Sequence, residues 1–136
     1  MRKNQNAFTL LEIMMVVAII GLLLAAAIYK MAPSLDVAKD TKVRADISGY
    51  RTSLLTYSAM NGFYPTTEQG LSALVVSPNS DPAPASWRQL MEELQKDPWG
   101  SDYVYRCPGQ KNPNGYDLFS AGPDRKPDTA DDNPSR

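Results

Sequence analysis

One apolar run near the amino terminus most constrains what this chain can form. From Ile13 to Ile28 there is no charged residue, so a helix here would cover most of a bilayer's hydrocarbon layer, which needs about 20 residues at 1.5 Å each. Glu12 lies at the edge of this run. An ionised carboxylate in lipid costs roughly 2.5–3.5 kcal/mol at the centre of a spanning helix and less near the interface. We therefore expect Glu12 to have a partner, and an amine is the obvious one.

Two ordinary interpretations of this segment compete. As a secretory signal, Arg2 and Lys3 would be its basic region and Ala25-Ala26-Ala27 its small-residue cleavage site, which would release a soluble domain from Ile28. That interpretation gives no reason for Glu12. As a plain membrane anchor, the same Arg2 and Lys3 would hold the amino end in the cytoplasm.

Length and composition limit the remainder. Beyond the apolar run, about 100 of the 136 residues remain, enough for one small domain with a modest core. With Lys+Arg 14 against Asp+Glu 15, and no basic patch with interleaved aromatics, a nucleic-acid partner is not indicated. Cys107 is the only cysteine, so it cannot form an intramolecular disulfide. The chain has no His to activate it and no Gly-rich phosphate loop, so we expect no enzyme.

The helical pattern continues past the apolar run. Pro33 is expected to kink or interrupt it, Ser34 could cap a restart, and Gly62 supplies a stop. Tyr50 and Tyr57 are expected to pack in the core. The apolar half could exchange lipid for neighbouring helices. One apolar stripe at helical spacing marks the amphipathic half: Val43, Ile47, Tyr50, Leu54 and Tyr57.

The rest reads as loops, short helices and two strands. Thr66 and Gln69 have capping-box spacing, which predicts a short helix through Leu74. Ser86 is expected to cap a second short helix. That helix would carry Trp87, Leu90, Met91 and Leu94, and both Trp87 and Trp99 are expected to pack rather than bind substrate. Strands are predicted over 103–107 and 116–120, giving an α+β domain with a small antiparallel sheet laid on the long helix.

A family resemblance rests first on the amino-terminal motif. Ala7-Phe8-Thr9-Leu10-Leu11-Glu12 resembles the class III signal of type IV pilins and pseudopilins. The resemblance implies that prepilin peptidase cuts between Ala7 and Phe8 and methylates the new amine of Phe8. It also implies that Glu12 neutralises the amino terminus of a neighbouring subunit during assembly. Ala7 stands where the family usually has Gly.

Three later segments, 64–71 (Tyr-Pro-Thr-Thr-Glu-Gln-Gly-Leu), 97–103 (Asp-Pro-Trp-Gly-Ser-Asp-Tyr) and 117–124 (Asp-Leu-Phe-Ser-Ala-Gly-Pro-Asp), make the resemblance more specific. They are similar to the major pseudopilin of type II secretion systems, in the family's order. The resemblance implies an α+β, pilin-like fold in three parts. These are a leader over 1–7, a transmembrane and assembly half-helix over 8–32, and a periplasmic domain over 33–136.

The same resemblance implies a setting and partners. The chain would cross the bacterial inner membrane once, with its amino end cytoplasmic and its domain periplasmic. It would form a homo-oligomeric pseudopilus with minor pseudopilins, after processing by prepilin peptidase and with an inner-membrane assembly platform, to drive protein export across the outer membrane. The alternatives are a type IV or competence pilin, and a secreted calcium-stabilised binding domain released after Ala27.

The tail holds the one candidate inorganic site. Its oxygen donors suit Ca²⁺, which takes six to eight oxygen ligands, whereas zinc is disfavoured because the chain has no His. On residues alone, a solvated acidic tail is the preferred interpretation. The crowded donors are the side chains of Asp124, Asp128, Thr129, Asp131 and Asp132.

The major pseudopilin family binds calcium in this loop, and the resemblance carries its ligand set onto this chain. Bound there, the ion would tie the tail to the sheet. Arg125 and Lys126 stand where the family often has Gly and an apolar residue. The implied ligands are the carboxylates of Asp124, Asp131 and Asp132, the hydroxyl of Thr129, and the carbonyls of Ala121 and Lys126.

Overall fold

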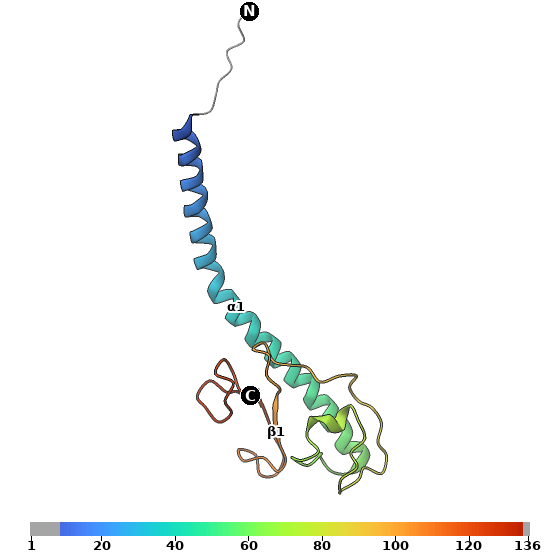
Figure 1. Cartoon of the computed structure of the whole chain (residues 1–136). Helices are drawn as coiled ribbons and strands as arrows, with labels where there is room; N and C mark the ends of the chain where they lie inside the picture. Colours follow the sequence, from blue (N-terminus) through green and yellow to red (C-terminus); the bar gives the residue numbers. More distant parts are fainter. Residues whose placement is uncertain (1–8, 135–136) are drawn as a thin grey trace, which may run out of the picture. The chain divides into compact units, whose positions relative to one another are not determined.

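The computed structural model describes the backbone of residues 9–134. Its contacts divide the chain into two compact units, Met1–Ala38 and Lys39–Arg136, and each is described by itself. The elements in chain order are helix α1 (Leu10–Asn61), the 3-10 helix η1 (Leu71–Leu74), and strands β1 (Val104–Arg106), β2 (Asp117–Ser120) and β3 (Asn133–Pro134) (Figure 1).

The described part of the first unit is almost entirely the amino-terminal part of α1. Its large hydrophobic side chains from Leu10 to Ile28 are exposed. Within the described residues, α1 is the one helix long and apolar enough to cross a membrane, and none of its most apolar window is buried. The helix includes positions 33 and 34, so the expected interruption at Pro33 with a restart at Ser34 is wrong. A proline inside a helix removes one backbone hydrogen bond and crowds the preceding turn, but α1 is continuous through this position.

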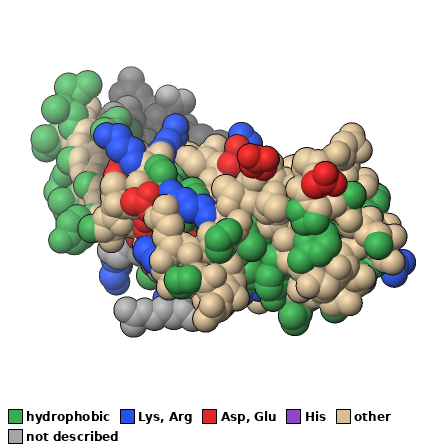
Figure 2. Space-filling view, turned by 90° about the horizontal axis from the view of Figure 1, so that it is seen from below, with side chains coloured by type: hydrophobic (Ala, Val, Ile, Leu, Met, Phe, Trp, Pro, Cys, Tyr) green, Lys and Arg blue, Asp and Glu red, His purple; other side chains and the backbone are tan. Residues whose placement is uncertain are grey.

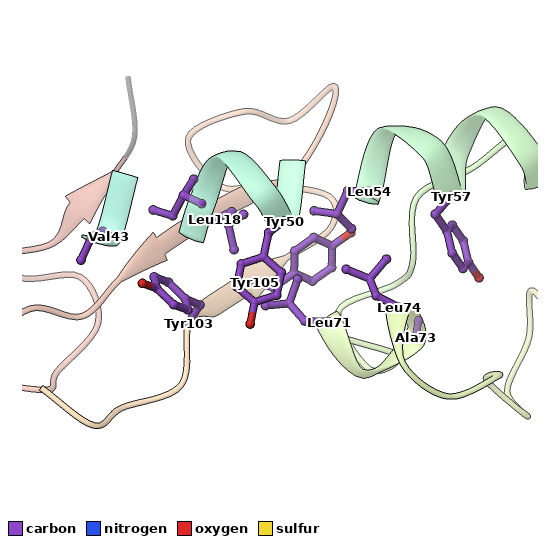
Figure 3. Packing of buried hydrophobic residues seen from close by; sticks show 11 residues of the cluster. Val43, Tyr50, Leu54, Tyr57, Leu71, Ala73, Leu74, Tyr103, Tyr105 and Leu118 are labelled. Atoms are coloured by element: carbon purple, nitrogen blue, oxygen red, sulfur yellow. The ribbon is translucent and has the colours of Figure 1, made fainter. Parts of the chain in front are cut away.

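The second unit is built on the predicted apolar stripe of α1. Its five side chains are each 1% exposed or less. Side chains of η1, of β1 and of the residue before β1 complete the core, as Figure 3 shows for Leu71, Leu74, Tyr105 and Tyr103. The rings of Tyr50 and Tyr103 meet edge to face, with centroids 5.4 Å apart. The predicted core roles of the stripe, including those of Tyr50 and Tyr57, are confirmed.

The helix ends where the sequence predicts. Gly62 adopts a φ of +84°, and its N–H donates to the carbonyl of Ser58 at 2.7 Å. A left-handed residue directly after a helix is a common C-terminal cap, and glycine adopts this conformation without a Cβ penalty. The end of α1 is therefore fixed by the backbone freedom of one residue.

The sheet has three antiparallel strands in the order β1-β2-β3. Tyr105 pairs with Leu118, and Phe119 pairs with Pro134. The two predicted strands are confirmed in shortened form, and β3 is an additional strand of two residues, too short to leave an alternating pattern. All four residues of the central strand β2 are buried.

The capping box at residues 66–69 forms as predicted. The backbone N–H of Thr66 donates to Gln69 Oε1 at 3.1 Å, and the N–H of Gln69 donates to Thr66 Oγ1 at 3.2 Å. The single helix expected to follow does not form, because Gly70 adopts a φ of +59°. Gly70 separates a turn from the short helix η1, which ends at Leu74.

The second short helix expected from Ser86 is absent from the described structure. Residues 86–94 contain no helix, and the N–H of Ser86 donates to the side chain of Asn61 at 3.0 Å. The N–H groups of Leu90 and Met91 donate to the carbonyl of Leu74 at 2.9 and 3.1 Å. These long-range partners replace the local hydrogen bonds of a helix.

Both tryptophans pack against the core, as predicted. The indole N–H of Trp87 donates to the carbonyl of Ala73 at 2.8 Å, which satisfies its one polar group. The ammonium of Lys39 lies 5.8 Å from the ring centre of Trp99, within the range of a cation–π contact.

Two adjacent leucines on α1 test whether the buried stripe supplies the stability of the second unit. Leu54 is fully buried and Leu55 is 63% exposed. We expect Leu54→Ala to lower the free energy of unfolding by about 2–5 kcal/mol, because it removes buried methyl groups and leaves a cavity. Leu55→Ala should change it by less than about 0.5 kcal/mol. Denaturant unfolding of the detergent-solubilised chain, followed by tryptophan fluorescence, measures both; equal effects would contradict the assignment.

Candidate functional site

The amino-terminal candidates are only partly described. Ala7 and Phe8 lie outside the described residues. Glu12 lies in the first turn of α1, and its N–H donates to both the carbonyl and the hydroxyl of Thr9, at 3.1 and 3.2 Å. Thr9 therefore caps the helix. Glu12 is exposed, and a carboxylate is favoured at this positive end of the helix dipole.

In the tail, Thr129 links several of the predicted ligands. Its hydroxyl lies 3.0 Å from the carbonyl oxygen of Lys126 and 2.7 Å from Asp131 Oδ1. The other oxygen of Asp131 accepts a hydrogen bond from the N–H of Asp124 at 3.3 Å. The structure thus gathers Asp124, Lys126, Thr129 and Asp131 in one small loop.

The carboxylate of Asp132 also contacts this loop. Its Oδ2 accepts a hydrogen bond from the backbone N–H of Asp128 at 2.9 Å. Its Oδ1 is buried and has no hydrogen-bond partner among the described residues. A buried carboxylate oxygen without a donor is costly, and a cation would satisfy it. Ala121, the remaining predicted ligand, is buried directly after β2.

The donor set fits a hard cation, although the carboxylates are not gathered around one point. No three His, Cys, Asp or Glu side chains within the described part of the chain form a metal-ligand group. Several carboxylate oxygens accept backbone N–H groups instead, as Asp124 Oδ1 does from Lys126 at 2.8 Å. Carboxylate, hydroxyl and carbonyl oxygens are the ligands Ca²⁺ prefers. The ligand set therefore stays a prediction, supported by the unsatisfied oxygen of Asp132.

Gly122 lets the tail loop close on the end of β2. Its φ is +67°, and a Cβ at this position would lie 2.5 Å from the carbonyl oxygen of Asp131 and 2.9 Å from Asp131 Oδ2. Those atoms are backbone and a carboxylate that is already hydrogen-bonded, so they could not move aside at low cost. Only glycine fits this close approach.

An ion pair joins the loop to the sheet. The guanidinium of Arg106, at the end of β1, donates to both carboxylate oxygens of Asp128, at 2.9 and 2.8 Å. These hydrogen bonds hold the pKa of Asp128 below its ordinary value of 3.8. The hydroxyl of Thr129 likewise holds the pKa of Asp131 below 3.8. Both carboxylates are therefore charged at neutral pH.

Because folding lowers the pKa of Asp128, its ionised form stabilises the folded state. A carboxyl whose pKa is depressed by folding stabilises the folded state above its unfolded pKa, and that stability is lost as the pH falls through the folded pKa. We expect the melting temperatures of wild type and Asp128→Asn to differ at about pH 5, and to converge as the pH falls through the folded-state pKa of Asp128. A pH series of thermal unfolding scans measures this; a constant difference would contradict it. Asp81→Asn, at an exposed site, is the control.

A buried carboxylate connects the tail to the turn at residues 97–101. Asp97 Oδ1 accepts the N–H groups of Trp99 and Ser101 at 3.1 and 2.7 Å. Asp97 Oδ2 accepts the hydroxyl of Ser120 at 2.6 Å, and the Ser120 oxygen accepts the N–H of Gly122 at 3.2 Å. The turn and the start of the tail loop therefore share one anchor.

Sequence reasoning assigned no role to Asp97, Ser120 or Arg106. The Asp-Pro-Trp-Gly run predicts a turn in which the Asp97 carboxylate binds the N–H groups that follow it. This local part of its role can be read from the sequence. Its long-range bond to Ser120 left no local signal. Asp117 was missed in the same way: its carboxylate accepts the backbone N–H groups of Gln110, Lys111 and Asn112 at 2.6, 2.8 and 3.0 Å.

The anchor at Asp97 makes a stability prediction. Asp97 is 4% exposed, so Asp97→Ala leaves several buried donors unpaired and should cost about 2–3 kcal/mol of unfolding free energy. Asp102→Ala is the control, because Asp102 is exposed and lies 3.9 Å from Lys96, a surface pair that contributes less than about 1 kcal/mol. Denaturant unfolding of both variants compares them, and an equal loss would argue against the anchor.

A comparison with solved structures identifies a protein with the same fold. The chain is similar to the crystal structure of the major pseudopilin from the type 2 secretion system of enterohaemorrhagic Escherichia coli, with a TM-score of 0.68 and 42% identity. The match covers 75% of this chain and 90% of that one. The predicted α+β, pilin-like fold is confirmed.

Two family models match along the chain. Residues 30–135 match "Type II secretion system (T2SS), protein G", and residues 2–28 match "Prokaryotic N-terminal methylation motif". The type II secretion system core protein G of Pseudomonas aeruginosa is 42% identical over 92% of this chain and 88% of its own length. That of Escherichia coli K12 is 41% identical over 95% and 89%. The chain belongs to the type II secretion system protein G family.

Proposed function

We propose that this chain is the major structural subunit of a type II secretion pseudopilus, and that it polymerises through α1 to drive protein export across the outer membrane. Membership of the protein G family and the likeness to a major pseudopilin support this role. The observation that carries it is the apolar first half of α1, whose large side chains from Leu10 to Ile28 are left exposed by the described fold. Such a surface needs lipid or neighbouring helices.

The same surface would serve two states of the protein. Before assembly, α1 would anchor the subunit in the inner membrane, with the amino end cytoplasmic and the folded domain periplasmic. In the filament, neighbouring helices of the same chain and of minor pseudopilins would replace the lipid. The role is that of a building block. Figure 2 shows both Lys and Arg and Asp and Glu side chains on the visible face of the molecule.

Processing and assembly would both act on the amino terminus. Prepilin peptidase would cut between Ala7 and Phe8, and the methylated amine of Phe8 would meet Glu12 of a neighbouring subunit. The match of residues 2–28 to the methylation motif supports this step, as does the exposure of Glu12. An amine and a carboxylate that pair in an apolar filament core neutralise each other's charge, whereas either one alone would be costly there.

The mass of the amino-terminal peptide, from protein made in its own cell background, discriminates among the alternatives. We expect a peptide that begins at N-methylated Phe8. A peptide beginning at Ile28 would instead indicate the secreted domain and would remove Glu12 with most of the apolar helix. A type IV or competence pilin is disfavoured by the protein G family match, and surface fibres would be its sign.

Glu12 gives the sharpest test of assembly. We expect Glu12→Gln to abolish pseudopilus formation and substrate export, because the neutral amide cannot compensate the neighbouring amine, while membrane insertion is retained. Glu68→Gln, at an exposed position of the second unit, should assemble normally. Crosslinking and electron microscopy of sheared filaments, together with a secretion assay, measure the outcome. Normal filaments from Glu12→Gln would rule out the pairing.

We also propose that the tail loop binds Ca²⁺ as a structural ion. Asp124, Asp131 and Asp132 would hold it with the Thr129 hydroxyl and the carbonyls of Ala121 and Lys126. The ion would supply positive charge to clustered oxygens. The residues themselves already form the loop and place Thr129 beside Lys126 and Asp131, and no donor among the described residues reaches Asp132 Oδ1.

Calcium should stabilise the folded chain, and Asp132 should be required for the effect. At a calcium concentration a hundredfold above Kd, the gain is about 2.7 kcal/mol. We expect Asp132→Asn to remove most of the calcium-dependent rise in melting temperature, and Glu92→Gln, at an exposed site away from the loop in sequence, to keep it. Thermal unfolding with calcium and with chelator measures both variants. A wild-type melting temperature that calcium does not change would rule out a structural ion.

A further inference from the structure

Arg106 holds the tail loop more firmly than an ordinary surface ion pair. Its two Nη atoms bind the two oxygens of Asp128 in a fork, and Nη1 also donates to Gln110 Oε1 at 3.2 Å. The guanidinium carbon lies 5.7 Å from the ring centre of Phe119, and the side chain is only 21% exposed. A planar guanidinium bound at both oxygens fixes the orientation of a carboxylate as well as its distance.

The backbone of Asp128 contacts Asp132, one of the predicted cation ligands. The φ of Asp128 is +68°, in the left-handed region, which aspartate tolerates better than most non-glycine residues. In that conformation its N–H donates to Asp132 Oδ2 at 2.9 Å. The other oxygen, Asp132 Oδ1, is the buried atom that has no hydrogen-bond partner among the described residues. Contacts thus run from Arg106 through Asp128 to the unsatisfied oxygen of Asp132.

We propose that Arg106 is a positioning residue for the cation site: its fork on Asp128 orients the Asp128 N–H, which occupies Asp132 Oδ2 and leaves Asp132 Oδ1 for the ion. This inference rests on the proposed calcium site. Among the described residues, the side-chain hydrogen bonds of Arg106 go to Asp128 and Gln110, and neither residue is in the predicted ligand set. Partners that orient metal ligands typically contribute 10–100-fold to metal affinity.

Arg106 also carries a positive charge near a cation site, and this charge acts in the opposite direction. Arg106→Gln would mix the two effects, because it would remove repulsion toward the ion together with the fork. Arg106→Lys separates them, since lysine keeps the charge but cannot bind both carboxylate oxygens with a planar fork. Arg125→Lys is the matched control: Arg125 lies in the same loop and forms no ion pair with any described residue.

The experiment measures calcium affinity of the full-length chain in detergent micelles by isothermal titration calorimetry. We expect Arg106→Lys to weaken calcium binding about 10-fold or more, and Arg125→Lys to leave Kd within about twofold of wild type. Asp128→Glu keeps the charge but lengthens the side chain, so it should weaken binding in the same direction as Arg106→Lys. Melting scans in chelator show that each variant is folded at the titration temperature.

The outcomes separate the two proposals. If the wild-type chain does not bind calcium, the proposed calcium role fails and the positioning role fails with it. If wild type binds and Arg106→Lys binds equally well, the calcium site stands and the positioning role is overturned. Equal weakening by Arg106→Lys and Arg125→Lys would also overturn it, because the effect would then come from any change of arginine in this region.

Discussion

The burial of one face of α1 is the interaction on which the second unit depends. Five side chains at helical spacing are almost fully buried there, and the helix, the 3-10 turn and the small sheet share them as one core. A sheet of such short strands cannot stabilise itself. Without this packing, neither the turn anchored by Asp97 nor the loop held by Arg106 would have a fixed base.

The features that the sequence predicts are those that depend on residues close together in the chain. The stripe on α1, the stop at Gly62 and the Thr66–Gln69 capping box depend on neighbours a few residues away, and all three were predicted. The helix expected from Ser86 was wrong, because the backbone there bonds to Asn61 and Leu74 instead of locally. Tertiary partners of this kind override local propensity.

The candidate site divides in the same way. Residue types and family resemblance pointed to the carboxylates of the tail, and the structure brings Asp124, Thr129 and Asp131 together. The residues that hold that loop in place were not predicted. Arg106 lies 22 positions before its partner Asp128, and Asp97 lies 23 positions before Ser120, so neither pair leaves a periodic or local pattern in the chain.

The central strand β2 has a consequence for how the sheet finds its register. All four of its residues are buried, so the alternation of inside and outside that normally fixes register is missing. Instead, each end carries a polar anchor: Asp117 binds the amides of residues 110–112, and Ser120 binds Asp97. A slip by one residue would break both sets of bonds at once and leave buried polar groups unpaired. The polar contacts at the two ends of β2 thus select its register. The hydrophobic side chains between them do not have to.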